Sequence, residues 1–180
     1  MLVREAPLPI AGLTDRAGLA RRLAASLYES TLLSALALAL GFALLPILGP
    51  QTPLPADGGV LPLPGPVAQT ASFACLVAVL GAYCVWGWSG GRSTLPMKTW
   101  RVALETTAGA PVSIARAAAR YGAWWIGPAL AVAGYAAWRP SGHGAWAAAL
   151  VAFNYAWAWV NADRQFLHDR IAGTRMVVVR

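Results

Sequence analysis

The stretch Arg21-Arg22-Leu-Ala-Ala-Ser-Leu-Tyr-Glu29 joins two bases and a lone carboxylate to the apolar run Leu32–Leu48. In a helix, Arg22 and Glu29 would lie about 20° apart around the axis and about 10 Å apart along it. Arg22 would then lie at a membrane surface, and Glu29 would lie below it, inside the bilayer. Because a carboxylate at that depth is costly, Glu29 indicates a site of some kind.

The rest of the chain is also apolar. Of its 180 residues, 58% are hydrophobic and only 12% are charged, whereas a soluble domain is about one quarter charged. Long stretches carry no Asp, Glu, Lys, Arg or His over roughly the length that a bilayer requires. These stretches are Ser30–Ala56, Val67–Gly91, Tyr121–Trp138 and Gly144–Ala162. We therefore expect an all-α membrane protein, one domain over residues 1–180, with four transmembrane helices at residues 23–45, 67–88, 121–138 and 145–161.

The segments between these predicted helices differ in character. Residues 46–66 are rich in proline and read as a periplasmic loop, because proline lacks an amide donor and ends a helix. Residues 89–120 form a cytoplasmic loop, in which Leu95–Thr99 suits a short turn or interfacial helix. The alternation in Trp100–Thr106 predicts a short strand. We expect it to pair with Thr174–Val179 as a small two-stranded sheet.

The basic residues predict how the chain lies in the membrane. Thirteen of the fourteen lysines and arginines fall on one side of the four-span arrangement, and only Arg139 falls on the other. The positive-inside rule makes the basic side cytoplasmic, together with both chain termini. Basic loops beside anionic lipid account for most of the net charge of +7 without nucleic acid as a partner.

Three separated blocks together resemble the RDD family of small bacterial membrane proteins. They are Ala-Gly-Leu-Ala-Arg-Arg22-Leu-Ala-Ala-Ser-Leu-Tyr-Glu29, Gly91-Arg-Ser-Thr94-Leu-Pro-Met-Lys98-Thr-Trp100-Arg101-Val, and Asp163-Arg164-Gln-Phe-Leu-His168-Asp169-Arg170-Ile-Ala-Gly173-Thr174-Arg175. The third block is the most specific of the three. The resemblance implies a location in the bacterial inner membrane.

The family is named for one arginine and two aspartates. By position, the resemblance assigns the arginine to Arg22, the first aspartate to Glu29, and the second to Asp169, with Asp163 as the alternative. Glu29 keeps the acid and lengthens its reach by one methylene. Pro96 stands where the family usually has glycine. Transport of ions or small solutes has been suggested for the family, so the resemblance implies the fold more firmly than the function.

Glu29 supports two interpretations. In the first, it is a titratable carboxylate that binds a cation or a proton and exchanges it across the membrane. In the second, it forms an ion pair with Arg22 or Arg120 that fixes helix packing. We predict that Glu29 is buried against the start of the third span and bonded to an arginine.

His168-Asp169-Arg170 is the other polar constellation. A metal site normally has three or four ligands, and His143 should lie on the opposite side of the membrane, so we expect no metal and no cofactor. We predict instead that Asp169 accepts hydrogen bonds from the arginines or the backbone amides of the Arg92–Arg101 loop, and so holds the C-terminal tail. The predicted polar cluster, structural or transporting, comprises Arg22, Glu29, Lys98, Arg101, Arg120, His168, Asp169 and Arg170.

Two functions fit these observations. No nucleophile with its base and orienting group can be recognised, so we expect no enzyme. The first function is that of an accessory or assembly subunit, which packs against a larger membrane complex or another copy of itself. The second is that of a small ion or solute transporter that uses Glu29. The first is favoured because Glu29 and Asn154 are the strongest polar candidates within the spans, and Asn154 suits a hydrogen bond to a neighbouring helix.

Overall fold

The computed structural model describes residues 15–49 and 63–179. The chain is mostly helical, with one small sheet. Most of the predicted proline-rich loop, residues 50–62, and the N-terminal residues 1–14 lie outside the described residues.

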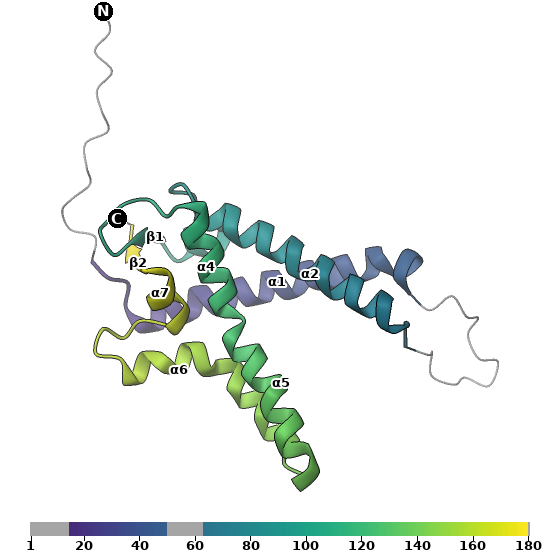
Figure 1. The fold of residues 1–180 in the computed structure, drawn as a ribbon. Helices are drawn as coiled ribbons and strands as arrows, with labels where there is room; N and C mark the ends of the chain where they lie inside the picture. Colours follow the sequence, from purple (N-terminus) through teal and green to yellow (C-terminus); the bar gives the residue numbers. More distant parts are fainter. Residues whose placement is uncertain (1–14, 50–62, 180) are drawn as a thin grey trace, which may run out of the picture.

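Two helices are long and apolar enough to cross a membrane, α1 (Leu19–Leu48) and α2 (Pro66–Trp88). They lie side by side, as Figure 1 shows. Helix α2 matches its predicted span, whereas α1 starts earlier and continues through Pro46. A proline so near a C-terminus removes only one hydrogen bond of the helix. The buried residues of α1, Arg22, Ala25, Glu29 and Leu33, follow the spacing of one helical face.

The other two predicted spans are each divided into two segments. The first consists of α4 (Ile114–Trp124) and α5 (Ile126–Trp138), and the second consists of the 3₁₀ helix η2 (Gly144–Ala152) and α6 (Phe153–Val160). A 3₁₀ turn, η1 (Arg139–Ser141), connects them. None of these segments is long enough to cross a membrane by itself, so four transmembrane helices remain a prediction.

The division between α4 and α5 has a local cause. Pro128 has no amide hydrogen to bond the carbonyl of Trp124 four residues earlier. The side-chain Nδ2 of Asn154 donates to that carbonyl at 2.8 Å instead. Asn154 is therefore bonded to a neighbouring helix, and it satisfies the group that the proline leaves free.

The short elements gather at one end of α1 and α2. The helix α3 (Leu95–Thr99) precedes β1 (Val102–Thr106), and α7 (Leu167–Ala172) precedes β2 (Thr174–Val178). The strands are antiparallel, with Val102 opposite Val178 and Thr106 opposite Thr174. The predicted sheet is thus confirmed. Backbone bonds from Ala17 to Met176 and from Val178 to Asp15 support this ribbon, which would be marginal alone.

The core lies at the same end, between the sheet, the first half of α1 and the second half of α2. Its buried side chains include Ala25, Leu33, Leu80, Cys84, Trp88, Met97, Val102, Leu104 and Met176. Helix α4 packs on α2 and α7, whereas α5 packs on η2 and diverges from α1 and α2 (Figure 1). The two helix pairs therefore meet at the sheet end and separate away from it.

Glycine permits the close contact between α5 and η2. A Cβ atom added at Gly127 would lie 2.5 Å from the carbonyl oxygen of Val151. That neighbour is backbone, which cannot rotate away as a flexible side chain can. By contrast, a Cβ at Gly122 on α4 would meet nothing within 4 Å.

Gly127→Ala should therefore destabilise the protein by about 1–3 kcal/mol, because α5 and η2 must move apart. Gly122→Ala is the matched control and should be neutral or stabilising by up to about 1 kcal/mol, since alanine favours helix. Denaturant unfolding of both variants in the same detergent measures the difference. Equal stability of the two variants would contradict the proposed close contact.

Candidate functional site

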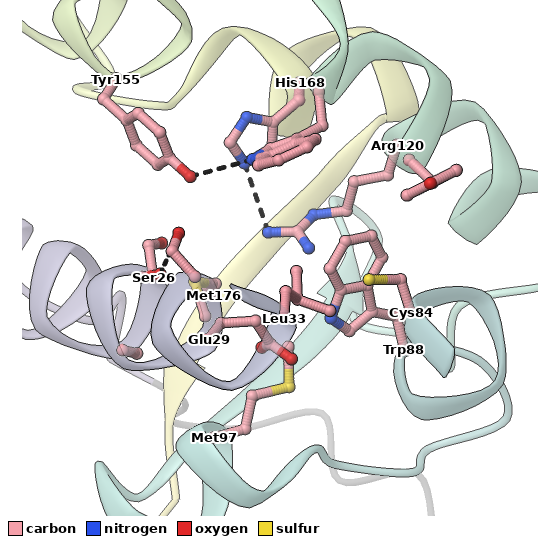
Figure 2. A pocket seen from close by; sticks show the side chains of 14 residues that line it. Ser26, Glu29, Leu33, Cys84, Trp88, Met97, Arg120, Tyr155, His168 and Met176 are labelled. Atoms are coloured by element: carbon pink, nitrogen blue, oxygen red, sulfur yellow. Dashed lines mark hydrogen bonds between the residues drawn. The ribbon is translucent and has the colours of Figure 1, made fainter. Parts of the chain in front are cut away.

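A buried ion pair lies where α4, α7 and the sheet meet. The Nε of Arg120 is 2.8 Å from the Oδ1 of Asp169, and the two side chains are 4% and 0% exposed. The Arg120 guanidinium lies 4.2 Å from the centre of the Trp88 ring. Its Nη2 is 3.5 Å from the Nε2 of His168, which accepts because arginine only donates. Figure 2 shows Arg120 reaching into the space between His168 and Trp88.

Asp169 also fixes the start of β2. The hydroxyl of Thr174 is 3.3 Å from the Oδ1 of Asp169 and donates to it. Between them, Gly173 turns the chain with a φ of 62°, in the left-handed region that favours glycine. The predicted donor is therefore wrong, because the arginine that reaches Asp169 is Arg120 on α4 and does not come from the Arg92–Arg101 loop.

Glu29 projects from α1 toward the same interior space (Figure 2). Its Oε2 accepts a hydrogen bond of 2.9 Å from the hydroxyl of Thr94, the residue that precedes α3. Glu29 is 9% exposed, so the predicted burial is correct. The predicted partner is wrong, because the bond comes from threonine and not from an arginine.

The two arginines expected to bond Glu29 have other partners. Arg120 is held by Asp169, and Arg22 turns toward the segment before α7. The Nη2 of Arg22 donates to the carbonyl of Arg164 at 2.6 Å, and its Cζ lies 5.0 Å from the centre of the Phe166 ring. Arg22 and Glu29 therefore share a helix face without forming an ion pair.

A small cavity connects these groups. It has a volume of about 30 Å³ and is lined by Glu29, Arg120 and His168, together with Cys84, Trp88, Tyr155 and other side chains. That volume holds about one water molecule. The cavity therefore places Glu29 near the Arg120–Asp169 pair without space for a larger solute.

Five of the eight predicted cluster residues are buried, namely Arg22, Glu29, Arg120, His168 and Asp169. Glu29, Arg120 and His168 line the small cavity, and Asp169 joins them through Arg120, whereas Arg22 turns toward Arg164. Lys98, Arg101 and Arg170 lie on the surface. Arg170 bonds the side chain of Asn161 at 3.2 Å. The sequence reasoning missed Thr94 and Trp88 as members of the site. Thr94 could have been found inside the Gly91–Lys98 block, but Trp88 resembled an ordinary interfacial tryptophan.

The environment sets the charge states of the groups on α7. Burial lowers the pKa of His168 to about 4, although Asp169 opposes the shift. Burial alone would raise the pKa of Asp169, but the Arg120 guanidinium and His168 outweigh it and hold that pKa below its usual value. Near neutral pH the site therefore contains a neutral imidazole beside a charged pair.

A model described as the RDD family matches residues 16–173, which is most of the chain and includes the whole buried cluster. Searches of curated proteins and of solved structures give no match.

Arg120→Gln should destabilise the protein by about 3–5 kcal/mol, because it leaves the Asp169 carboxylate buried without a counter-charge. Arg16→Gln is the matched control. It breaks a pair with Asp163 of 3.0 Å whose side chains are about half exposed, and such pairs contribute only about 0–1 kcal/mol. Denaturant unfolding in detergent compares the two. A similar cost for both would show that the buried pair does not hold the fold.

Stability should fall as the pH drops from 6.5 toward 4, because the unfolded chain protonates His168 over this range and the folded chain does not. The loss attributable to this residue is at most about 3 kcal/mol. Asp169 acts at lower pH, below its ordinary value of 3.8. The free energies of unfolding of the wild type and of His168→Gln, measured from neutral pH down to pH 4, should run parallel above pH 6.5 and diverge below it. Profiles that stay parallel down to pH 4 would contradict the assignment.

Proposed function

The chain belongs to the RDD family of membrane-type proteins, and we propose that it is a non-catalytic accessory or assembly subunit of a larger membrane complex. Its buried polar cluster serves to fix the fold. Its outer apolar faces make the functional contacts.

One observation carries this proposal. At the centre of the site, Arg120 bonds Asp169 and Glu29 accepts from Thr94, while the Oε1 of Glu29 and the Oδ2 of Asp169 are buried without a hydrogen-bond partner among the described residues. The cavity between them holds about one water molecule. A cluster of this kind supports a structural clamp better than a route for solutes.

The outer faces are suited to contacts within a membrane. Helix α1 exposes Leu38, Phe42 and Ile47 on the half that lies away from the sheet. The helix pairs also separate there, since α5 and η2 diverge from α1 and α2 (Figure 1). In a bilayer these faces are covered by lipid or by protein, and the diverging pairs give a partner two surfaces to contact.

The proposal includes an orientation in the bacterial inner membrane with both termini in the cytoplasm. The structure describes bases around the sheet end, such as Arg92, Lys98 and Arg101, whereas Arg139 follows the far end of α5. This separation supports the positive-inside orientation of a four-span protein.

A second candidate function is transport of an ion or small solute. The divisions between α4 and α5 and between η2 and α6 favour it, because transporters often place binding sites at interrupted helices. In that function Glu29 would be the exchanging carboxylate.

Ion and proton flux into liposomes distinguishes the two functions. We expect liposomes that contain the purified wild-type protein to show the same flux as empty liposomes and as liposomes with Glu29→Gln, because the cavity beside Glu29 holds about one water molecule. In mild detergent, the wild type extracted from its native membrane should migrate as a complex of fixed composition that is larger than its own oligomer.

Flux that depends on Glu29 would overturn the accessory function and support transport. The fixed complex must also survive in Glu29→Gln, provided that this variant retains the wild-type unfolding midpoint. A protein that is silent in liposomes and migrates only as a monomer or homo-oligomer would refute the proposal as well.

A further inference from the structure

A second, larger cavity opens beside the first turn of α1. Its volume is about 300 Å³. Its charged lining residues are Arg16, Arg22, Arg164, Arg175, Asp163 and Asp169. The arginines outnumber the aspartates by two, so the cavity favours an anion.

Each aspartate is bonded to an arginine through its Oδ1, and the Oδ2 of Asp169 is buried without a hydrogen-bond partner among the described residues. Asp169 bonds Arg120 at 2.8 Å, and Arg120 lies outside this cavity. Asp163 bonds Arg16 at 3.0 Å. The charges of Arg22 and Arg164 therefore have no carboxylate bonded to them among the described residues, and they remain available to a bound anion.

The start of α1 supplies further donors. Ala17, Gly18 and Leu19 line the cavity. The capping residue Gly18 has no side chain to bond the first amides, and the first turn contains no acidic residue. The first free amides of a helix carry partial positive charge, and together with the helix dipole they bind anions. This helix has 30 residues, which makes the dipole fully developed at that end.

Arg22 gives an independent indication of a ligand. It is 7% exposed and lines the cavity. Its Nη2 bonds the Arg164 carbonyl, but its Nε is buried and has no hydrogen-bond partner among the described residues. A buried donor without a partner is unfavourable, because it has lost its bonds to water and gained none. An anion drawn into this cavity would let the guanidinium reorient and satisfy that donor.

We propose that this cavity binds a phosphate group, through the first amides of α1 and the guanidinium of Arg22. A phosphate has enough oxygens to accept from both at once, and arginine matches its geometry. The cavity is larger than a phosphate ion, so the headgroup of a phospholipid also fits. Helix α1 is long and apolar enough to cross a membrane, which places its N-terminus near lipid headgroups.

The test uses three variants of the full chain that each lower the net charge by one. Arg22→Gln removes the guanidinium. Gly18→Asp adds a carboxylate that caps the helix and competes with the anion, and a Cβ at this position meets nothing within 4 Å. Arg21→Gln is the matched control, because Arg21 is exposed on the adjacent position and does not line the cavity.

The first arm of the experiment uses nanodiscs that contain phosphatidylglycerol and phosphatidylcholine in equal amounts, with native mass spectrometry of the lipid that the protein retains. The second arm measures the unfolding midpoint in neutral detergent as inorganic phosphate replaces chloride at constant ionic strength. Arg22→Gln and Gly18→Asp should each weaken binding roughly tenfold in the arm where the wild type binds, since each removes or blocks a charge-assisted contact.

The two arms separate the sources of the phosphate. Retention of phosphatidylglycerol alone identifies a lipid headgroup, and stabilisation by inorganic phosphate identifies a free phosphate. Gly18→Asp should keep or raise the unfolding midpoint without ligand, so its loss of binding cannot result from misfolding. The proposal is refuted if the wild type binds in neither arm, if Gly18→Asp binds as the wild type does, or if Arg21→Gln loses as much binding as the other two.

Discussion

The ion pair between Arg120 and Asp169 is the interaction on which the arrangement of the chain depends. It joins α4 to α7 across 49 positions of sequence, and Thr174 extends it to the first residue of β2. Removing two charges from water is costly, and the attraction between them offsets that cost only with good geometry and additional hydrogen bonds. Here Trp88 and His168 complete the surroundings of the guanidinium. The pair therefore favours one register of α7 and β2, because any other register would leave one of the two charges buried without its partner.

Features that depend on local pattern could be predicted from the sequence. The β-branched run Val177–Val179 and the alternation after Trp100 predicted the sheet, because strand periodicity is readable over few residues. The apolar runs predicted α1 and α2, and the spacing of Arg22 and Glu29 predicted their common buried face. The two helices, the common face of Arg22 and Glu29, and the individual strands each depend on the geometry of a single element. The pairing of the two strands was an inference across the chain, made from the two strand patterns.

The choice of partners could not be predicted in the same way. Glu29 had two arginines within plausible reach, and no local pattern selects Thr94, a neutral donor 65 positions away. The preference depends on Asp169, which engages Arg120 and so removes it as a partner. The division after Trp124 depends similarly on a partner from another helix. Pro128 leaves a carbonyl free, and only the tertiary position of Asn154 makes that tolerable.

The separation of Arg22 from Glu29 follows from the same competition. Both side chains emerge from one face of α1, but Glu29 lines the smaller cavity and Arg22 lines the larger, basic one. Asp169 connects the two cavities. Its side chain lines the larger one, and its ion-pair partner Arg120 lines the smaller one. Arg22, Glu29 and Asp169 thus lie in one buried cluster without a direct bond between Arg22 and Glu29. The Asp169–Arg120 pair and Met176, which lines both cavities, are contacts through which a change at the Arg22 cavity can reach the surroundings of Glu29.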